Sequence, residues 1–91
     1  MTDVSTNTAK PWYFYLARCG DGSLYSGICV DLEARFAKHN SGKGAKYTRS
    51  RLPVTMVYSE ELESRSAALK REAEVKRWSK DRKEQLAARA A

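Results

Sequence analysis

The sequence predicts an α+β fold in which a three-stranded mixed or antiparallel sheet is flanked by helices, with the element order β-β-α-β-α-α. Two short aromatic and β-branched runs lie on either side of a Gly-Asp-Gly-Ser turn, and a third run follows later in the chain. The last third of the chain is rich in helix-forming residues. With 91 residues we expect one domain over residues 11–91, preceded by a polar tail over residues 1–10.

The first half of the domain is expected to form a β-hairpin followed by a helix. The strands span residues 12–19 and 24–30, with Asp-Gly in the turn between them. Asp31 is a favourable N-cap residue for a helix over residues 32–40, which ends at a glycine-rich stretch. Two apolar residues spaced i,i+4 on this helix are expected to pack onto the hairpin.

The second half is expected to add one strand and two helices. The strand covers residues 53–60, with a proline at its start, where a missing N–H is tolerated. Ser64 begins a helix that runs to about Trp78, and Ser79 begins a final helix. The acidic residues 60–63 are interpreted as a solvated loop.

Charge and composition narrow the classes of function. The net charge of +6 favours a polyanionic partner, since lysine and arginine neutralise phosphates and release counterions. No apolar run approaches the roughly 18 residues of a membrane span, and no signal peptide is visible, so a cytoplasmic location with no membrane partner is expected. Cys19 and Cys29, on neighbouring strands, are within geometric reach of a disulfide but are expected to be free buried thiols.

Polar residues with catalytic potential gather around the hairpin and the first helix. Arg35 and His39 are spaced i,i+4, an arrangement suited to gripping a phosphate and moving a proton. Tyr25 and Gly27 share one strand face, so the glycine leaves room for a ligand beside the tyrosine. Tyr15 on the first strand is a second candidate for holding a water. Solvated helix residues and ordinary strand packing are the alternatives.

A basic, glycine-containing segment follows the first helix. Its glycines let the backbone approach a phosphate, and its cations with one interleaved aromatic residue suit nucleic acid. A flexible basic loop without a partner is equally consistent with the pattern. The candidate nucleic-acid-binding residues are Lys43, Lys46, Tyr47, Arg49 and Arg51.

Glu72 is the one candidate metal ligand. On the second main helix it falls near the centre of an apolar stripe that includes Leu69 and Val75. Burial of a carboxylate costs several kcal/mol unless the group is paired or binds a metal. An ion pair with Arg65 or Lys76 is one explanation, and a single oxygen ligand for a hard divalent cation is the other.

The order and spacing of these signals resemble the GIY-YIG nuclease family. A strand ending in "YFY" is followed by "YSG", then by an arginine eight residues on and a histidine four residues later. The segments "GKGAKYT" and "ALKREAEVKRWSKDRKEQL" are similar to the small stand-alone bacterial members with a URI-type domain. The resemblance covers about residues 11–86 and implies a three-stranded antiparallel sheet flanked by helices.

Carried over by position, the resemblance implies a role for each of five residues. Tyr15 would be the tyrosine of the first motif and Tyr25 that of the second. Arg35 would be the helix arginine and His39 the histidine one turn further on. Glu72 would be the metal-binding glutamate.

Two features depart from the family pattern. The first motif reads "YFY" instead of Gly-Ile-Tyr, which makes Tyr13 a rival for Tyr15. No separate DNA-binding domain is evident, which leaves room for a protein partner that supplies substrate specificity.

The resemblance implies a metal-dependent endonuclease that hydrolyses phosphodiester bonds. One Mg²⁺ or Mn²⁺ ion would be its cofactor, and its substrate would be DNA more than RNA, in structured, branched or damaged form during repair or recombination. Tyr15, alone or with Tyr25, would deprotonate the attacking water, with nearby cations lowering the tyrosine pKa. Two other classes remain open: a catalytically silent nucleic-acid-binding module of the same fold, and an interaction subunit whose charge serves only solubility.

Overall fold

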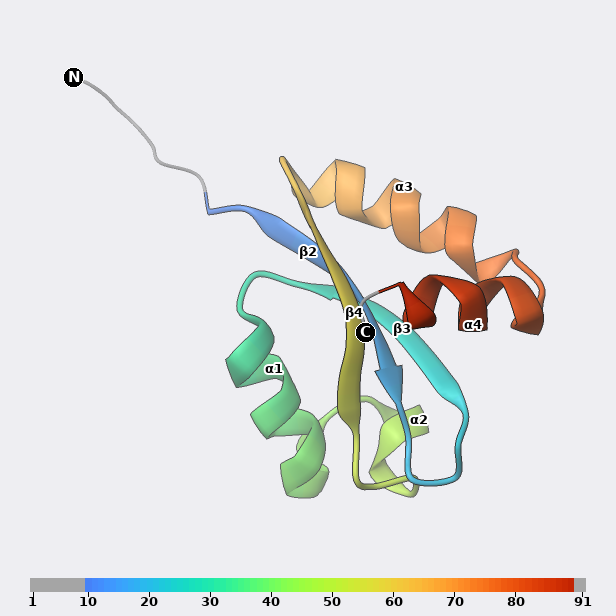
Figure 1. Cartoon of the computed structure of the whole chain (residues 1–91). Helices are drawn as coiled ribbons and strands as arrows, with labels where there is room; N and C mark the ends of the chain where they lie inside the picture. The colour runs from blue at the N-terminus through green and yellow to red at the C-terminus, as the bar shows by residue number, and fades with distance from the viewer. Residues whose placement is uncertain (1–9, 90–91) are drawn as a thin grey trace.

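A computed structural model describes residues 10–89 as a three-stranded sheet flanked by helices (Figure 1). The α+β class is confirmed. The predicted tail lies outside the described residues except for Lys10, which is exposed. The elements are β2 (Trp12–Arg18), β3 (Leu24–Cys29), α1 (Leu32–Lys38), the π-helical segment η1 (His39–Lys43), α2 (Lys46–Arg49), β4 (Thr55–Leu62), α3 (Arg65–Lys76) and α4 (Lys80–Ala88).

The sheet is antiparallel throughout, with the strand order β3-β2-β4. The sequence left mixed and antiparallel sheets open, and the register decides between them. On the central strand β2, Tyr15 lies opposite Gly27 of β3 on one side and Ser59 of β4 on the other. The tyrosine of the first motif therefore stands in the middle of the sheet.

One face of the sheet carries the apolar core that holds α3 and α4. Phe14 and Leu16 project to this face from β2 and pack with Val75 of α3 and Leu86 of α4. Successive strand residues point to opposite faces, so these two residues of β2 leave Tyr15 on the other side. The two long helices thus cover the face away from Tyr15 (Figure 1).

The other face is covered by α1. Leu32 and Phe36, the predicted i,i+4 pair, pack against a second cluster of buried residues that includes Tyr15. The ring of Phe36 meets the ring of Tyr15 edge-on, with their centroids 5.0 Å apart. The helix therefore packs on the hairpin as expected. This packing brings Arg35 of α1 next to Tyr15.

The predicted helix starts are confirmed. The side chains of Asp31, Ser64 and Ser79 each accept a hydrogen bond from the backbone N–H three residues further on, which satisfies a donor that the helix itself leaves unpaired.

The predicted loop after α1 is wrong, because the chain continues through η1 and α2 as two short helical segments. The side chain of Asn40 fastens this region to the start of β4: its Nδ2 donates to the Val54 carbonyl at 2.8 Å, and its Oδ1 accepts from the Val54 N–H at 2.7 Å. These contacts between distant residues hold the basic segment in one conformation.

The predicted solvated acidic loop over residues 60–63 is also wrong in part, since β4 extends to Leu62. Glu60 is half-buried and pairs with Arg71 of α3, with Oε1 and Nε 2.7 Å apart. Tyr58 donates its hydroxyl proton to the same carboxylate at 2.5 Å. The negative charge is thus compensated at the junction of β4 and α3.

Cys19 and Cys29 are buried free thiols, as expected. Cys19 follows β2 at the hairpin turn, whereas Cys29 ends β3 at the other end of the hairpin, opposite Tyr13. The suggestion that a disulfide is within reach is therefore wrong. Among residues 10–89, no helix has the length and apolar character needed to cross a membrane.

A matched pair of leucines tests the division between core and surface. Leu69, predicted to lie in the apolar stripe of its helix, is exposed, whereas Leu16 is buried. We expect Leu16→Ala to lower the free energy of unfolding by about 2–5 kcal/mol, because it leaves a cavity in the core. Leu69→Ala should change it by no more than about 0.5 kcal/mol. Urea denaturation followed by circular dichroism measures both values, and equal losses would contradict the assignment.

Candidate active site

Five side chains from five different elements meet on the α1 face of the sheet. We refer to them as the tyrosine–histidine cluster. Ring–ring contacts and hydrogen bonds join its members to one another. The cluster comprises Tyr15 of β2, Tyr25 of β3, Arg35 of α1, His39 of η1 and Tyr47 of α2.

A buried chain of hydrogen bonds runs through the cluster. The hydroxyl of Tyr15 lies 2.9 Å from Nε2 of His39, and Nδ1 of His39 lies 3.0 Å from Oγ1 of Thr48. Thr48 donates its single hydroxyl proton to the carbonyl of Ala45 at 2.9 Å. Its oxygen can therefore only accept from Nδ1–H, which leaves Nε2 of His39 unprotonated. It follows that Tyr15 donates its hydroxyl proton to His39.

The environment keeps His39 neutral. Its side chain is 0% exposed, and burial together with the charge of Arg35 lowers the pKa of the imidazole below its usual value. A neutral imidazole with a free Nε2 lone pair is ready to accept a proton at neutral pH.

The pKa of Tyr15 moves in the opposite direction from the one expected. Burial raises it from 10.0 to about 12, and this outweighs the opposing effect of Arg35, whose Nε–H makes a long hydrogen bond of 3.4 Å to the hydroxyl. The expectation that nearby cations lower this pKa is therefore wrong in its net result. Tyr15 stays protonated at neutral pH unless its proton passes to His39.

Two glycines make room for this pair of side chains. A Cβ at Gly27 would lie 2.5 Å from the hydroxyl of Tyr15, and a Cβ at Gly44 would lie 2.5 Å from Nδ1 of His39. The sequence interpretation gave the space at Gly27 to a ligand beside Tyr25. The structure shows that the hydroxyl of Tyr15 fills it.

The outer side of the cluster is aromatic and cationic. Tyr25 is half-buried and stacks on Tyr47, with their ring centroids 5.8 Å apart and their planes 21° apart. Tyr47 is 39% exposed, and the guanidinium of Arg51 lies 3.9 Å from its ring centroid. Tyr15 is 0% exposed, so Tyr25, Tyr47 and Arg35 form the side of the cluster that solvent reaches.

The predicted nucleic-acid-binding residues fall into two groups. Lys43, Lys46 and Arg49 are exposed on η1 and α2, and within residues 10–89 no carboxylate forms an ion pair with them. Arg51 pairs with Asp21 at 3.0 Å and donates to the Tyr47 carbonyl at 2.7 Å. Arg51 therefore links α2 to the hairpin turn, whereas Lys43, Lys46 and Arg49 are exposed to solvent.

Glu72 lies on α3, the helix that covers the opposite face of the sheet from Tyr15. Its side chain is only 18% exposed and pairs with Lys76, Nζ to Oε2 at 3.5 Å. Arg65, the other predicted partner, lies instead over the ring of Trp12. The ion-pair explanation thus holds for Lys76, which is itself 57% exposed.

Glu72 offers a single carboxylate as a candidate metal ligand. Within the described part of the chain, no three His, Cys, Asp or Glu residues are grouped to hold a metal. A half-buried carboxylate balanced by one solvated ammonium group fits the usual Mg²⁺ arrangement of one carboxylate, several waters and substrate phosphate.

Some residues of the site carry no recognisable signal in the sequence. Thr48 fixes the tautomer of His39, but a threonine nine residues after a histidine matches no helical or strand period. Gly44 is visible only as part of a glycine-rich segment. For the two rival tyrosines, the polar contacts go to the hydroxyl of Tyr15, while Tyr13 packs beside it on the same face.

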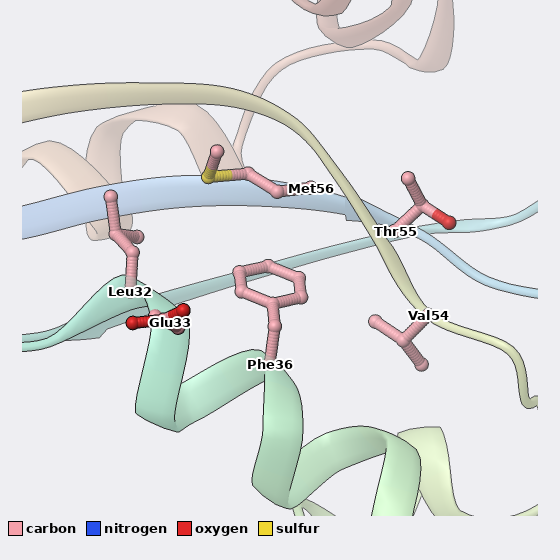
Figure 2. Close-up of a pocket in the computed structure, with 6 residues that line it drawn as sticks. All are labelled: Leu32, Glu33, Phe36, Val54, Thr55 and Met56. Atoms are coloured by element: carbon pink, nitrogen blue, oxygen red, sulfur yellow. The ribbon is translucent and has the colours of Figure 1, made fainter.

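One hollow on the described part of the chain is separate from the cluster's polar side. It has a volume of about 460 Å³ and lies between α1 and the start of β4, where Phe36 faces Val54 and Met56 (Figure 2). Its lining is apolar except for Thr55 and the carboxylate of Glu33. A negative charge beside an apolar wall repels phosphate, so this hollow is unsuited to a nucleic-acid backbone.

Tyrosines on an antiparallel sheet, a helix arginine and a buried histidine thus meet in one cluster, as the resemblance to a nuclease family implies. A family model described as the GIY-YIG catalytic domain matches residues 11–85, and the chain belongs to this family.

Its relatives include proteins named UPF0213. The chain is 51% identical over 74 residues to one from Staphylococcus saprophyticus, covering 81% of this chain and 90% of the relative. It is 55% identical over 71 residues to one from Streptococcus sanguinis, covering 78% and 82%.

Solved structures agree with the fold. The solution structure of a UPF0213 protein from Bacillus halodurans is 45% identical with a TM-score of 0.56, covering 86% of this chain and 83% of that one. The solution structure of a protein from E. faecalis is also 45% identical with a TM-score of 0.59, covering 88% and 85%.

The single histidine of the chain makes the electrostatics of the cluster measurable. We expect the imidazole resonance of His39 in NMR spectra to titrate with a midpoint below the ordinary value of about 6.5. Arg35→Ala should raise this midpoint, because the guanidinium disfavours the imidazolium form. Lys38→Ala, which removes a neighbouring charge on the same helix, is the control and should leave it in place. A midpoint at or above 6.5 in the unaltered protein would contradict the buried neutral state.

Proposed function

We propose that this protein is a metal-dependent endonuclease that hydrolyses phosphodiester bonds of DNA. The observation that carries the proposal is the buried hydrogen-bond chain from Tyr15 through His39 to Thr48. Packing alone would be served by apolar side chains, because burying polar groups brings no net gain unless all of them are paired. In this series of hydrogen bonds, the neutral His39 can accept a proton through Tyr15. The series is therefore suited to taking a proton from water.

In the proposed step, a water attacks phosphorus and one P–O ester bond breaks, its electron pair going to the leaving oxygen, while a proton of the water passes to the hydroxyl oxygen of Tyr15. The proton that Tyr15 already carries moves at the same time to Nε2 of His39, 2.9 Å away. No free phenolate is needed, which removes the difficulty of a tyrosine pKa of about 12. Because Tyr15 is 0% exposed, the substrate must shift the outer ring of Tyr25 before a water can touch Tyr15.

Arg35 is proposed to hold the scissile phosphate. Its guanidinium already lies beside Tyr15 and remains charged at all relevant pH values. A cation fixed at the position where negative charge increases in the transition state lowers the barrier. The exposed cations Lys43, Lys46 and Arg49 would hold the adjoining backbone.

Glu72 is proposed to bind the metal ion. Mg²⁺ or Mn²⁺, when bound, would supply positive charge that polarises a phosphate and stabilises a leaving oxygen. Because α3 lies on the opposite face of the sheet from Tyr15, this role requires the bound DNA to extend past the edge of the sheet toward Glu72. The carboxylate contributes one ligand, and its partner Lys76 is solvated enough to turn away.

Most of the net charge supports a second area of contact with DNA. Residues 65–89, which include α3, α4 and the residues that follow each helix, contain nine lysines and arginines against four acidic residues, a net charge of +5 out of +6. These helices lie on the opposite face of the sheet from the tyrosine–histidine cluster. Positive charge on both sides of a small domain suits branched or bent DNA in repair or recombination, with a protein partner narrowing the choice of substrate.

The second candidate function is a catalytically silent nucleic-acid-binding module. The complete burial of Tyr15 and the ion pair of Glu72 with Lys76 favour it, since both groups are engaged within the protein. Such a module would bind DNA with a strong dependence on salt and cleave nothing.

A cleavage assay separates the two functions. The protein is incubated with branched, nicked, single-stranded and duplex DNA in Mg²⁺, Mn²⁺ or EDTA. We expect metal-dependent nicking that Tyr15→Phe lowers by about 100- to 10,000-fold and Arg35→Ala by about 100- to 1,000-fold. Glu72→Gln should abolish nicking, whereas the control Glu74→Gln, at an exposed carboxylate on the same helix, should retain it.

The outcomes of this assay are distinct. Cleavage that persists in EDTA and in Glu72→Gln would overturn the metal-dependent mechanism. Salt-sensitive binding without cleavage of any substrate would support the silent module.

The pH dependence of cleavage tests the route of the proton. A neutral His39 is needed as acceptor, so the rate should rise with pH through the lowered pKa of His39, below about 6.5, and then level off. A mechanism that starts from ionised Tyr15 would instead give a rate that rises tenfold per pH unit toward the tyrosine pKa of about 12. Initial rates between pH 5 and 10, about the range where DNA and protein remain intact, distinguish the two. A continuous rise across that range would contradict the His39 route.

A further inference from the structure

We propose that a hollow beside Arg35, distinct from the tyrosine–histidine cluster, receives an unpaired nucleotide of the DNA strand. The hollow, which we call the Trp12 pocket, has a volume of about 390 Å³ and lies where β3 leads into α1. This volume falls within the roughly 300–1,000 Å³ of small-molecule sites. The inference deepens the proposed function and rests on it for the position of the phosphate.

Part of the pocket lining suits a nucleobase. It includes the half-buried Trp12 together with Ile28 and the exposed Val30. Aromatic side chains stack on bases of any sequence, and apolar neighbours extend the contact. A partly exposed aromatic and aliphatic lining of this kind is the usual support for an unstacked base.

The lining residues that come from α1 suit a phosphate. Arg35 and Lys38 both line the pocket, and their i,i+3 spacing places the two cations on one side of the helix. The carboxylate of Asp31 also borders the pocket, but its Oδ1 accepts the N–H of Ala34 at 3.0 Å as the cap of the helix. The two cations therefore outweigh one carboxylate that is already engaged.

Arg35 links the pocket to the proposed site of cleavage. Its Nε–H reaches the hydroxyl of Tyr15 at 3.4 Å, while the same residue lines the Trp12 pocket. A strand whose scissile phosphate lies on Arg35 thus has its neighbouring nucleotide at the mouth of the pocket.

Three other hollows lack this combination. The one shown in Figure 2 has Glu33 as its charged lining residue and would repel a phosphate. A hollow of about 270 Å³ lined by Lys80, Lys83 and Glu84 has no aromatic residue in its lining. A hollow of about 170 Å³ beside Trp78 is smaller. Two guanidinium groups flank the ring of Trp78, Arg82 at 3.9 Å and Arg71 at 5.1 Å from its centroid, whereas the ring of Trp12 has one, Arg65, at the longer distance of 5.9 Å.

The shape of the pocket favours an unpaired nucleotide over a duplex. A base in a duplex has both faces stacked on its neighbours and must be extruded before it can lie against Trp12. Extrusion costs little for a base that is mismatched or already single-stranded. The preferred substrate therefore has a flap, gap, loop or mismatch next to the bond that is cut.

Tryptophan fluorescence tests the pocket directly, because the chain has two tryptophans. In Trp78→Phe, Trp12 is the remaining tryptophan, and its emission should be quenched in a saturable manner by short oligothymidine in EDTA. A fully paired hairpin of the same length should quench it much less. In Trp12→Phe, the emission of Trp78 is the matched control and should change little. If Trp78→Phe does not fold, the quenching of the unaltered protein minus that of Trp12→Phe gives the same quantity.

Binding measured by fluorescence anisotropy gives the second readout. Trp12→Ala should weaken the binding of oligothymidine by about 5- to 150-fold, the range for loss of one stacked base. Trp12→Phe should retain most of the affinity, because a ring remains. Quenching of Trp12 by the paired hairpin to the same extent as by oligothymidine would overturn the inference. So would tight binding of oligothymidine with no change in Trp12 emission.

The results also separate this inference from the proposed endonuclease activity. Binding of oligothymidine at Trp12 without cleavage of any DNA would support the pocket and overturn the proposed activity. Metal-dependent cleavage with equal rates on paired and unpaired substrates, unchanged in Trp12→Ala, would support the activity and overturn the pocket.

Discussion

The buried hydrogen bond between Tyr15 and His39 is the constraint on which the local structure depends. Both side chains are fully buried, so each polar atom needs a partner inside the protein, and a lost partner costs about 1–3 kcal/mol. Thr48 supplies the partner for the second imidazole nitrogen. Gly27 and Gly44 supply the space. The hairpin, the helical segment after α1 and the turn of α2 are thereby held around one pair of side chains.

The two faces of the sheet differ in what the side chains of the central strand β2 contact. Phe14 and Leu16 point to the side where α3 and α4 bury the apolar core. Tyr15 points to the side where α1 brings in Arg35 and His39. Because neighbouring residues of a strand face opposite ways, one short segment serves both purposes. The proposed chemistry therefore depends on a residue of β2, the central strand, which pairs with a strand on each side.

Arg35 affects both titrating groups of the cluster and also lines the neighbouring pocket. It lowers the pKa of His39, opposes the rise in the pKa of Tyr15, and lines the Trp12 pocket. Desolvation is nevertheless the larger effect on both titrating groups, and it leaves a protonated tyrosine beside a neutral histidine. That pairing supports transfer of a proton along an existing hydrogen bond and makes a free phenolate unnecessary. Most of the net positive charge lies in residues 65–89, on the other side of the sheet from this pair, where the proposed function places a second area of contact with DNA.

The sequence by itself determined the features that depend on neighbours along the chain. These are the α+β class, the hairpin, the caps at Asp31, Ser64 and Ser79, and the i,i+4 pairing of residues on the first helix, all of which follow from local periodicity and turn chemistry. Only the tertiary structure decided which group fills the space at Gly27, how Thr48 orients His39, why the pKa of Tyr15 rises, and that Glu72 lies on a helix across the sheet from Tyr15. Periodicity tells which way a side chain points, whereas burial and hydrogen-bond partners depend on what the fold brings opposite to it from distant parts of the chain.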